Sequence, residues 1–371
     1  MKALFAGQGF GFWYKAARPI SFGQSVMPYV LGALLGLSTL IYAGANTGID
    51  FGISGLGILS GVTSAGILGI AAGILTGIIG LAGVIFAHAG MNLLDDYFDM
   101  KKGAVERREE LLDGGFRARL GKCSYLKSGE VTLDDTKRAA LTFLGLALSL
   151  GAVTFALRGW EVLIFAGITL VLGVFYAGPP LRLSYRGFGE LVIGFLFGPV
   201  LVTASSFLVS GQITPLALFS SVPIGLLVAN IVHIHAVMDY GPDLAAQRKT
   251  LPILLGSERA GVVMNIIFVV LAQLTILVGI ALGFLPIAAL LVALTYPLSL
   301  VFIKLALDYV KNKDSKEAAF EPKKWMGNFG DWESFRKDGL DWFMSRWLTA
   351  RNLVMQLTLV LAIAAFTPWY L

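Results

Sequence analysis

Residues 67–99 read ILGIAAGILTGIIGLAGVIFAHAGMNLLDDYFD, an apolar run that ends in a cluster of acidic residues. No charged residue occurs in this stretch before Asp95. The uncharged part is longer than the roughly 20 residues that a helix needs to cross a hydrocarbon core about 30 Å thick. The stretch therefore predicts a membrane-spanning helix with carboxylates at one of its ends.

The composition of the whole chain agrees with this prediction. Of its 371 residues, 56% are hydrophobic and 14% are charged, whereas a soluble domain carries about 25% charged residues. We therefore expect an integral protein of the lipid bilayer, of the all-α polytopic class, and no nucleic-acid partner. Nine transmembrane helices are predicted, at approximately residues 20–43, 66–93, 139–157, 160–178, 189–209, 214–238, 261–282, 285–306 and 349–369.

Lysine and arginine are distributed unevenly between the predicted loops. With nine spans and a cytoplasmic N-terminus, 28 of the 29 basic residues lie on the cytoplasmic side and only Arg158 lies on the other. This is the asymmetry that the positive-inside rule describes. We predict a multi-pass inner-membrane protein whose C-terminus is outside and whose active site opens to the cytoplasm. The oligomeric state is left open, and the single Cys123 predicts no intrachain disulfide.

Three regions follow from the span pattern. We expect residues 1–306 to form a transmembrane core of two four-helix repeats around a central cavity, and residues 349–371 to form the ninth helix. Between them, residues 307–348 are polar but rich in tryptophan and phenylalanine, which predicts a cytoplasmic amphipathic insertion. This insertion is either a membrane-anchoring loop or a lid or docking element. Residues 44–65 are glycine-rich and are expected to form a re-entrant or extended outer loop.

The first acidic cluster closes the second predicted span and is followed by Lys101 and Lys102. Helix positions three and four apart share a face, so its carboxylates are expected to converge. Asn92 lies one turn earlier on the same side. The cluster reads Asn92-Leu-Leu-Asp95-Asp96-Tyr97-Phe98-Asp99.

A second acidic cluster closes the sixth span, the equivalent position of the second half. Gly241 and Pro242 predict a bend into a loop after Asp239. Parallel repeats place a shared site between their halves, so the two clusters are expected to face one ligand. The second cluster comprises Asn230, His233, His235, Asp239, Asp243 and Lys249.

A third conspicuous stretch, residues 176–190, lies in the predicted cytoplasmic loop between spans four and five. Its glycines and prolines predict a tight turn. It contributes Tyr176, Arg182, Tyr185 and Arg186 as candidate binding residues, although the two arginines are also explained as topological charges. Arg117, after Gly114-Gly115, is a weaker candidate.

Carboxylates near the bilayer centre cost on the order of 3 kcal/mol each, so these clusters require water or cations. Aspartate oxygens hold Mg²⁺, Mg²⁺ holds a diphosphate, and basic side chains hold the remaining phosphate oxygens. Ordinary solvated helix ends are the alternative, and two clusters at equivalent places argue against it. The predicted metal ligands are Asp95, Asp96, Asp99, Asp239 and Asp243, of which all but Asp95 are assigned as catalytic.

These motifs resemble the UbiA superfamily of intramembrane aromatic prenyltransferases over roughly residues 20–305. Three stretches look most like the menaquinone branch, which prenylates 1,4-dihydroxy-2-naphthoate. They are Asn92 to Asp99 with Lys102-Gly103, Tyr185 to Glu190, and Lys249-Thr250-Leu251. Asp95 stands where that branch usually has asparagine, and Met238 where many members have arginine.

The resemblance implies Mg²⁺-dependent transfer of a polyprenyl group from its diphosphate to an aromatic acceptor. The expected binding residues are Asn92, Asp95, Lys102, Arg117, Tyr176, Arg182, Tyr185, Arg186, Asn230, His235 and Lys249. Other acceptors (hydroxybenzoate, homogentisate or a glycerol ether) and terpene cyclisation remain open within the superfamily. A cation-coupled transporter is the alternative from another class.

Overall fold

The computed structural model describes residues 7–42, 67–101, 123–178, 180–245, 247–311 and 320–367. Within these ranges the chain is helical, with a single isolated β-bridge and no named strand. The α-helices are α1 (Phe10–Ala16), α2 (Gly23–Tyr42), α3 (Ile67–Lys101), α5 (Ser124–Lys127), α6 (Leu133–Arg158), α7 (Trp160–Ala177), α8 (Gly189–Phe195), α9 (Leu201–Ser210), α10 (Pro215–Met238), α11 (Tyr240–Ala245), α12 (Leu251–Leu254), α13 (Glu258–Ala281), α14 (Tyr296–Lys311), α15 (Trp332–Lys337) and α16 (Asp341–Ala365).

Eight helical segments are long and apolar enough to cross a membrane, and α7 is a shorter apolar helix. A π-helical turn, Leu196–Val200, joins α8 to α9 in one span, and a 3₁₀ segment, Ile287–Thr295, leads into α14. Each of the nine predicted spans overlaps one of these helical segments, so the all-α membrane fold is confirmed. The count of nine spans and the internal repeat stay predictions.

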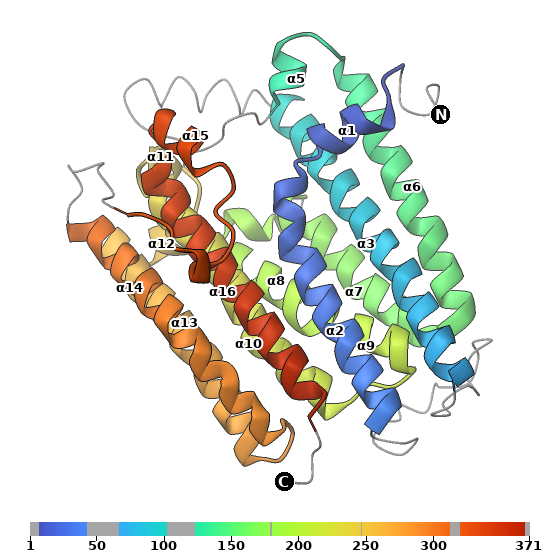
Figure 1. Ribbon diagram of the computed structural model, residues 1–371. Coiled ribbons are helices and arrows are strands. Elements are labelled where there is room, and N and C mark those ends of the chain that lie inside the picture. The colour runs from blue at the N-terminus through green and yellow to red at the C-terminus, as the bar shows by residue number, and fades with distance from the viewer. Residues whose placement is uncertain are drawn as a thin grey trace.

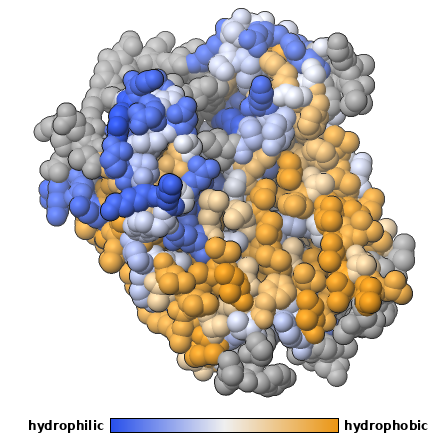
Figure 2. Space-filling model, viewed as in Figure 1, coloured by the Kyte–Doolittle hydropathy of each residue, from blue (hydrophilic) through white to orange (hydrophobic). Residues whose placement is uncertain are grey.

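The helices run roughly side by side as one bundle, with α1, α5, α11 and α15 gathered at its upper end (Figure 1). Helix α1 lies at this end, whereas α16 finishes at the opposite end. Figure 2 shows the same division in chemistry, because hydrophilic residues cover the upper part and hydrophobic residues cover the lower. An apolar belt with a polar cap is the expected surface of a protein that stands in a bilayer.

Two hydrophobic clusters hold the bundle together. The larger joins α2, α9, α10, α13, α14 and α16, and the smaller joins α1, α3, α5 and α6. Helices α10 and α16 lie well inside the bundle, whereas most of α3 and α6 is exposed at its periphery. Close packing of α10 depends on glycine, since a Cβ at Gly198 would lie 2.4 Å from the Cα of Gly225.

The acidic clusters differ locally from expectation. Helix α3 continues eight residues beyond the predicted end of its span at residue 93, so the first cluster is wholly helical. The loop predicted after Asp239 is wrong: Asp239 caps α10 and the short helix α11 follows directly. Pro242 is accommodated because it lies in the first turn of α11, where its missing N–H has no helical partner to lose.

The described part of the predicted insertion is a folded segment. Its residues Met326, Phe329 and Trp332 are buried and belong to the larger hydrophobic cluster. Helix α16 begins at Asp341, eight residues before the predicted start of the ninth span. The predicted outer loop 44–65, together with Lys102 and Arg117, lies outside the described residues, and the side chain of Asp99 is not described.

Candidate active site

At the first acidic cluster, Asp96 is fully buried against the N-terminal segment and α5. The hydroxyl of Tyr125 donates a hydrogen bond of 3.1 Å to Asp96 Oδ2. Arg18 Nη2 lies 3.2 Å from Asp96 Oδ1 and 3.8 Å from Asp95 Oδ2. Burial raises the pKa of Tyr125, and the charge of Asp96 raises it further, so the phenol remains a hydrogen-bond donor. Neither Arg18 nor Tyr125 was singled out from the sequence.

Asn92 of α3 is hydrogen-bonded to the segment that precedes α2. Its Nδ2 donates to the carbonyl oxygen of Ala17 at 2.8 Å and to Ser21 Oγ at 3.0 Å. One turn earlier, His88 contacts Ser21 and Ser25 at 3.3 and 2.8 Å. The amide of Asn92 therefore fixes the segment that carries Arg18, and the ligand contact expected of Asn92 from the sequence stays a prediction.

The second acidic cluster contains two buried carboxylates, Asp239 at 4% and Asp243 at 2% exposure. His235 Nε2 lies 3.3 Å from Asp239 Oδ2, and the His235 ring meets Phe343 of α16 edge-on at 5.1 Å. Arg248 Nη1 lies 3.4 Å from Asp243 Oδ1. Each carboxylate thus has a nitrogen donor nearby, from α10 or from the turn after α11.

The turn after α11 directs Arg248 inward and Lys249 outward. Gln247 has a left-handed backbone (φ 53°), and the Arg248 N–H returns to the carbonyl of Asp243 at 2.9 Å. The Arg248 guanidinium also lies 5.2 Å from the ring centroid of Tyr185. Burial would lower the pKa of Arg248, but the opposing charges, led by Asp243, raise it, so the cation persists.

Lys249, by contrast, is exposed, and its backbone forms a parallel bridge with Arg186. The side chain of Arg186 reaches the carbonyl of Pro180 at 3.4 Å. Arg182 is exposed and has a left-handed backbone (φ 45°) at the start of the 3₁₀ turn Leu183–Tyr185. The loop of residues 180–188 therefore borders the second cluster.

Tyr176 joins the two clusters. Its phenol lies within electrostatic range of Glu190, Arg248 and Asp95. Asp95 belongs to the first cluster, whereas Arg248 pairs with Asp243 of the second. The charges of both clusters therefore act on the phenol of Tyr176, which lies on α7 near the end of the bundle that carries them.

Two buried polar pairs lie along α10 below the site. His233 Nδ1 is 3.3 Å from Glu190 Oε1, and His233 Nε2 is 3.0 Å from the Gly261 carbonyl oxygen. Because a carbonyl only accepts, Nε2 must carry a proton. Asn230, predicted to bind substrate, is fully buried and accepts a 2.6 Å hydrogen bond from Asn265 of α13. Both pairs join helices to one another.

Among the residues that the structure describes, no three His, Cys, Asp or Glu side chains form a group that could hold a metal ion. The carboxylates of the two clusters are nonetheless hard oxygen donors of the kind that Mg²⁺ binds. Mg²⁺ is commonly held by one or two carboxylates together with substrate phosphates, rather than by a cage of protein ligands. The residues therefore fit a Mg²⁺ ion that arrives with a diphosphate.

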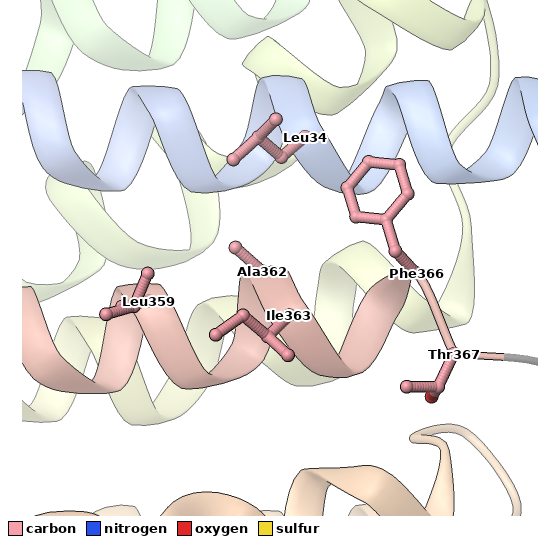
Figure 3. Close-up of a pocket in the computed structure, with 6 residues that line it drawn as sticks. All are labelled: Leu34, Leu359, Ala362, Ile363, Phe366 and Thr367. Atoms are coloured by element: carbon pink, nitrogen blue, oxygen red, sulfur yellow. The ribbon is translucent and has the colours of Figure 1, made fainter.

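An apolar groove lies between α2 and α16 (Figure 3). Its residues come from the C-terminal halves of α2 and α16 and from the two residues after α16, at the end of the bundle opposite the aspartates. Its volume is about 510 Å³. The side chains that line it are Leu34, Leu359, Ala362, Ile363, Phe366 and Thr367. The groove is suited to a hydrocarbon chain and to no charged group.

A family model described as the UbiA prenyltransferase family matches residues 58–328, well over half of the chain. The chain belongs to this family. The resemblance drawn from the acidic motifs is thereby confirmed.

Several curated relatives of this UbiA-family chain act on naphthoate compounds by name. It is 30% identical over 176 residues to 1,4-dihydroxy-2-naphthoate octaprenyltransferase of Bacillus subtilis (47% of this chain, 53% of that protein). It is 34% identical over 131 residues to 2-carboxy-1,4-naphthoquinone phytyltransferase of Synechocystis (34% and 42%). It is 26% identical over 205 residues to the octaprenyltransferase of Mycobacterium tuberculosis (55% and 66%). The chain spans about half the length of the curated relatives it matches.

Solved structures show the same fold. A UbiA homolog from Archaeoglobus fulgidus bound to DMAPP and Mg²⁺ is 16% identical, with a TM-score of 0.51 over 95% of this chain and 98% of that one. The apo UbiA homolog from Aeropyrum pernix K1 is 14% identical, with a TM-score of 0.55 over 93% and 97%.

Proposed function

We propose that this chain transfers a polyprenyl group from a polyprenyl diphosphate to an aromatic acceptor, and that the acceptor is 1,4-dihydroxy-2-naphthoate in menaquinone biosynthesis. The observation that carries the proposal is the presence of two acidic clusters at the same end of the bundle, each with a buried carboxylate beside an arginine. The names of the relatives support the acceptor.

The metal would be Mg²⁺, held by Asp95, Asp96 and Asp99 of one cluster and by Asp239 and Asp243 of the other. When bound, it supplies charge that stabilises the diphosphate as it leaves. The near-complete burial of Asp239 and Asp243 supports this assignment, because buried carboxylates require compensating cations.

Basic side chains around the clusters would hold the diphosphate. Arg248 is the strongest candidate, since it is retained as a cation beside Asp243. Arg186 and Lys249 border it as exposed charges, for which a smaller contribution is expected, and Lys102 and Arg117 belong to the same proposed set. Negative charge builds on the diphosphate as it leaves, and cationic groups that stabilise this charge lower the activation barrier of the transfer most.

Aromatic side chains would bind the allylic cation and the acceptor ring. Tyr176 and Tyr185 can present ring faces to a cation, and Tyr185 already lies under the Arg248 guanidinium. His235 and Phe343 form an edge-on aromatic pair beside Asp239, which is a suitable wall for a flat acceptor. The allylic C–O bond to the diphosphate would break, and attack of the acceptor ring on the allylic cation would form the new C–C bond. Loss of the ring carboxylate as CO₂ would return an electron pair to the ring and restore its aromaticity.

The hydrocarbon tail would lie along the apolar bundle. The groove between α2 and α16 supports this placement for a long tail (Figure 3). The basic residues support a cytoplasmic site, because the acidic clusters lie at the polar end of the bundle (Figures 1 and 2). This orientation puts the N-terminus in the cytoplasm and the C-terminus outside.

The test is prenyl transfer by the purified protein in lipid nanodiscs. A polyprenyl diphosphate is offered with a panel of aromatic acids, with Mg²⁺ or with EDTA. We expect Mg²⁺-dependent prenylation of 1,4-dihydroxy-2-naphthoate, and its loss in Asp239→Ala and Asp243→Ala. The variant Asp134→Ala, an exposed carboxylate at the start of α6, is the matched control.

The other outcomes separate the alternatives. Product from a different aromatic acid would keep the reaction and reject the naphthoate acceptor. Diphosphate release without an aromatic product would indicate a cyclase. No diphosphate release with any acceptor would reject prenyl transfer and favour cation-coupled transport.

A further inference from the structure

Residues 320–330, here called the strap, form an element that the proposed reaction does not use. The strap leads to α15 and includes the 3₁₀ turn Lys324–Met326, which lies against the side of α16 and below α15 (Figure 1). Gln356 Nε2 of α16 donates to the carbonyl of Trp325 at 2.9 Å. At 1.5 Å per residue, Gln356 lies about 22 Å along the axis from Asp341, the first residue of α16. The strap therefore reaches down into the part of α16 predicted to span the membrane.

The strap is fixed to α16 by hydrogen bonds. Arg351 Nη2 and Asn352 Nδ2 both donate to the carbonyl of Asn328, at 2.5 and 3.1 Å. Gly327 has a left-handed backbone (φ 99°), and a Cβ there would lie 2.9 Å from Asn352 Nδ2. Only glycine fits this approach without displacing Asn352, so the strap is seated closely on the helix.

Side chains of the strap divide into an inner and an outer set. Met326 and Phe329 are buried in the larger hydrophobic cluster. Trp325, which lies between Lys324 and Met326, is 48% exposed. Because α16 holds the carbonyl groups of Trp325 and Asn328, the exposure of this indole is a fixed feature of the surface. Burying it requires something outside the bundle.

The outer set also carries charge. Lys323 and Lys324 are exposed, and neither forms an ion pair with a residue in the described ranges. The nearby Glu321 is paired with Arg336 of α15. The strap thus presents one indole and two uncompensated ammonium groups at three consecutive positions, beside the cytoplasmic half of the predicted ninth span.

We propose that Trp325, Lys323 and Lys324 form a binding site for the headgroup of an anionic phospholipid. The indole would lie at the level of the glycerol backbone, where tryptophan is enriched in membrane proteins. The two ammonium groups would bind the phosphate and the anionic headgroup. This assignment makes the strap a membrane anchor. It does not depend on the proposed reaction.

The experiment measures tryptophan quenching in nanodiscs by brominated phosphatidylglycerol and by brominated phosphatidylcholine. The emission of Trp325 is obtained as the difference between the wild-type protein and Trp325→Phe. We expect phosphatidylglycerol to quench this emission at a lower mole fraction than phosphatidylcholine. Lys323→Gln/Lys324→Gln should raise the mole fraction of phosphatidylglycerol for half-quenching by at least fivefold, since each lysine near an anionic surface contributes about fivefold.

Trp160 is the matched control. It is 45% exposed and begins α7, and the neighbouring Arg158 is buried. The emission isolated by Trp160→Phe should be quenched equally by both lipids, and the lysine variants should not change it. Emission from Trp325 that neither lipid quenches would overturn the proposal and favour docking of a soluble partner. Equal quenching of Trp325 by both lipids, unchanged in the lysine variants, would overturn the headgroup site.

Discussion

Replacement of Arg248 by glutamine is the sharpest test of the second acidic cluster, because Lys249 supplies an adjacent control. Arg248 lies 3.4 Å from Asp243 Oδ1 and 5.2 Å from the Tyr185 ring centroid. Asp243 is 2% exposed, so Arg248→Gln leaves a buried carboxylate without this cation. Lys249 is exposed and contributes only its backbone to the bridge with Arg186.

The magnitude follows from these contacts. A hydrogen bond between a guanidinium and a charged phosphate oxygen contributes about 1.5–3 kcal/mol. Because Asp243 and Tyr185 hold the Arg248 guanidinium in place, we expect its contact with the diphosphate to be near the upper end of this range, a loss of about 2–3 kcal/mol in Arg248→Gln. At 1.36 kcal/mol per factor of ten, kcat/KM for the diphosphate donor should fall roughly 30- to 150-fold. An exposed charge such as Lys249 contributes about 0.2–1 kcal/mol, so Lys249→Gln should lower kcat/KM for the diphosphate donor by at most about fivefold.

The assay is steady-state prenyl transfer in nanodiscs at saturating acceptor and varied diphosphate donor. Arg248→Lys should retain part of the activity, because it keeps the charge but loses the planar fork. The thermal midpoint of each variant separates lost binding from lost folding. If Lys249→Gln reduced kcat/KM as much as Arg248→Gln, the direction of the turn at Gln247 would be refuted, and with it this account of the cluster.

Further variants test three other parts of the structure. Tyr125→Phe should destabilise the protein by about 2 kcal/mol, because it removes a hydrogen bond to the buried Asp96. Since burial and Asp96 raise the pKa of Tyr125, the phenol stays protonated, and the drop in thermal midpoint should be the same from about pH 6 to 9. Arg158→Met should lower the thermal midpoint by an amount equivalent to about 2–3 kcal/mol, because Arg158 donates to two carbonyls at the end of α9 at 2.7 and 2.6 Å; an unchanged midpoint would contradict this. Glu190→Gln and His233→Asn should each cost about 3 kcal/mol, and a double variant that costs the full sum would show that the two side chains are not coupled.

The fold was largely predictable because each membrane span is a long, uncharged run of sequence. The segment 67–99 and the basic loops were sufficient to predict a helical bundle and to predict that the two acidic clusters lie at the same end of it. Helix ends were less predictable, since α3 and α16 both extend beyond the apolar part of their sequence. Tertiary contacts, and not hydropathy, decide where such extensions stop.

The partners of the aspartates could not be predicted, because they come from distant segments. Arg18 reaches Asp96 from the N-terminal turn, where its backbone is left-handed (φ 59°). Tyr125 reaches the same carboxylate from α5. The choice between Arg248 and Lys249 depended on one backbone angle, at Gln247. Nothing in the composition of these segments distinguishes the residue that turns inward from its neighbour.

Polar residues within a predicted span are more informative than they first appear. Arg351, Asn352 and Gln356 lie in the first turns of the ninth predicted span, where a polar group without a hydrogen-bond partner costs several kcal/mol in hydrocarbon. The structure explains them, because carbonyls of the strap accept from all three. The strap in turn is held against α16 by these side chains, which fixes the position of Trp325 along the helix. A polar residue in a span therefore indicates a missing partner segment, and here the tryptophan-rich insertion is that partner.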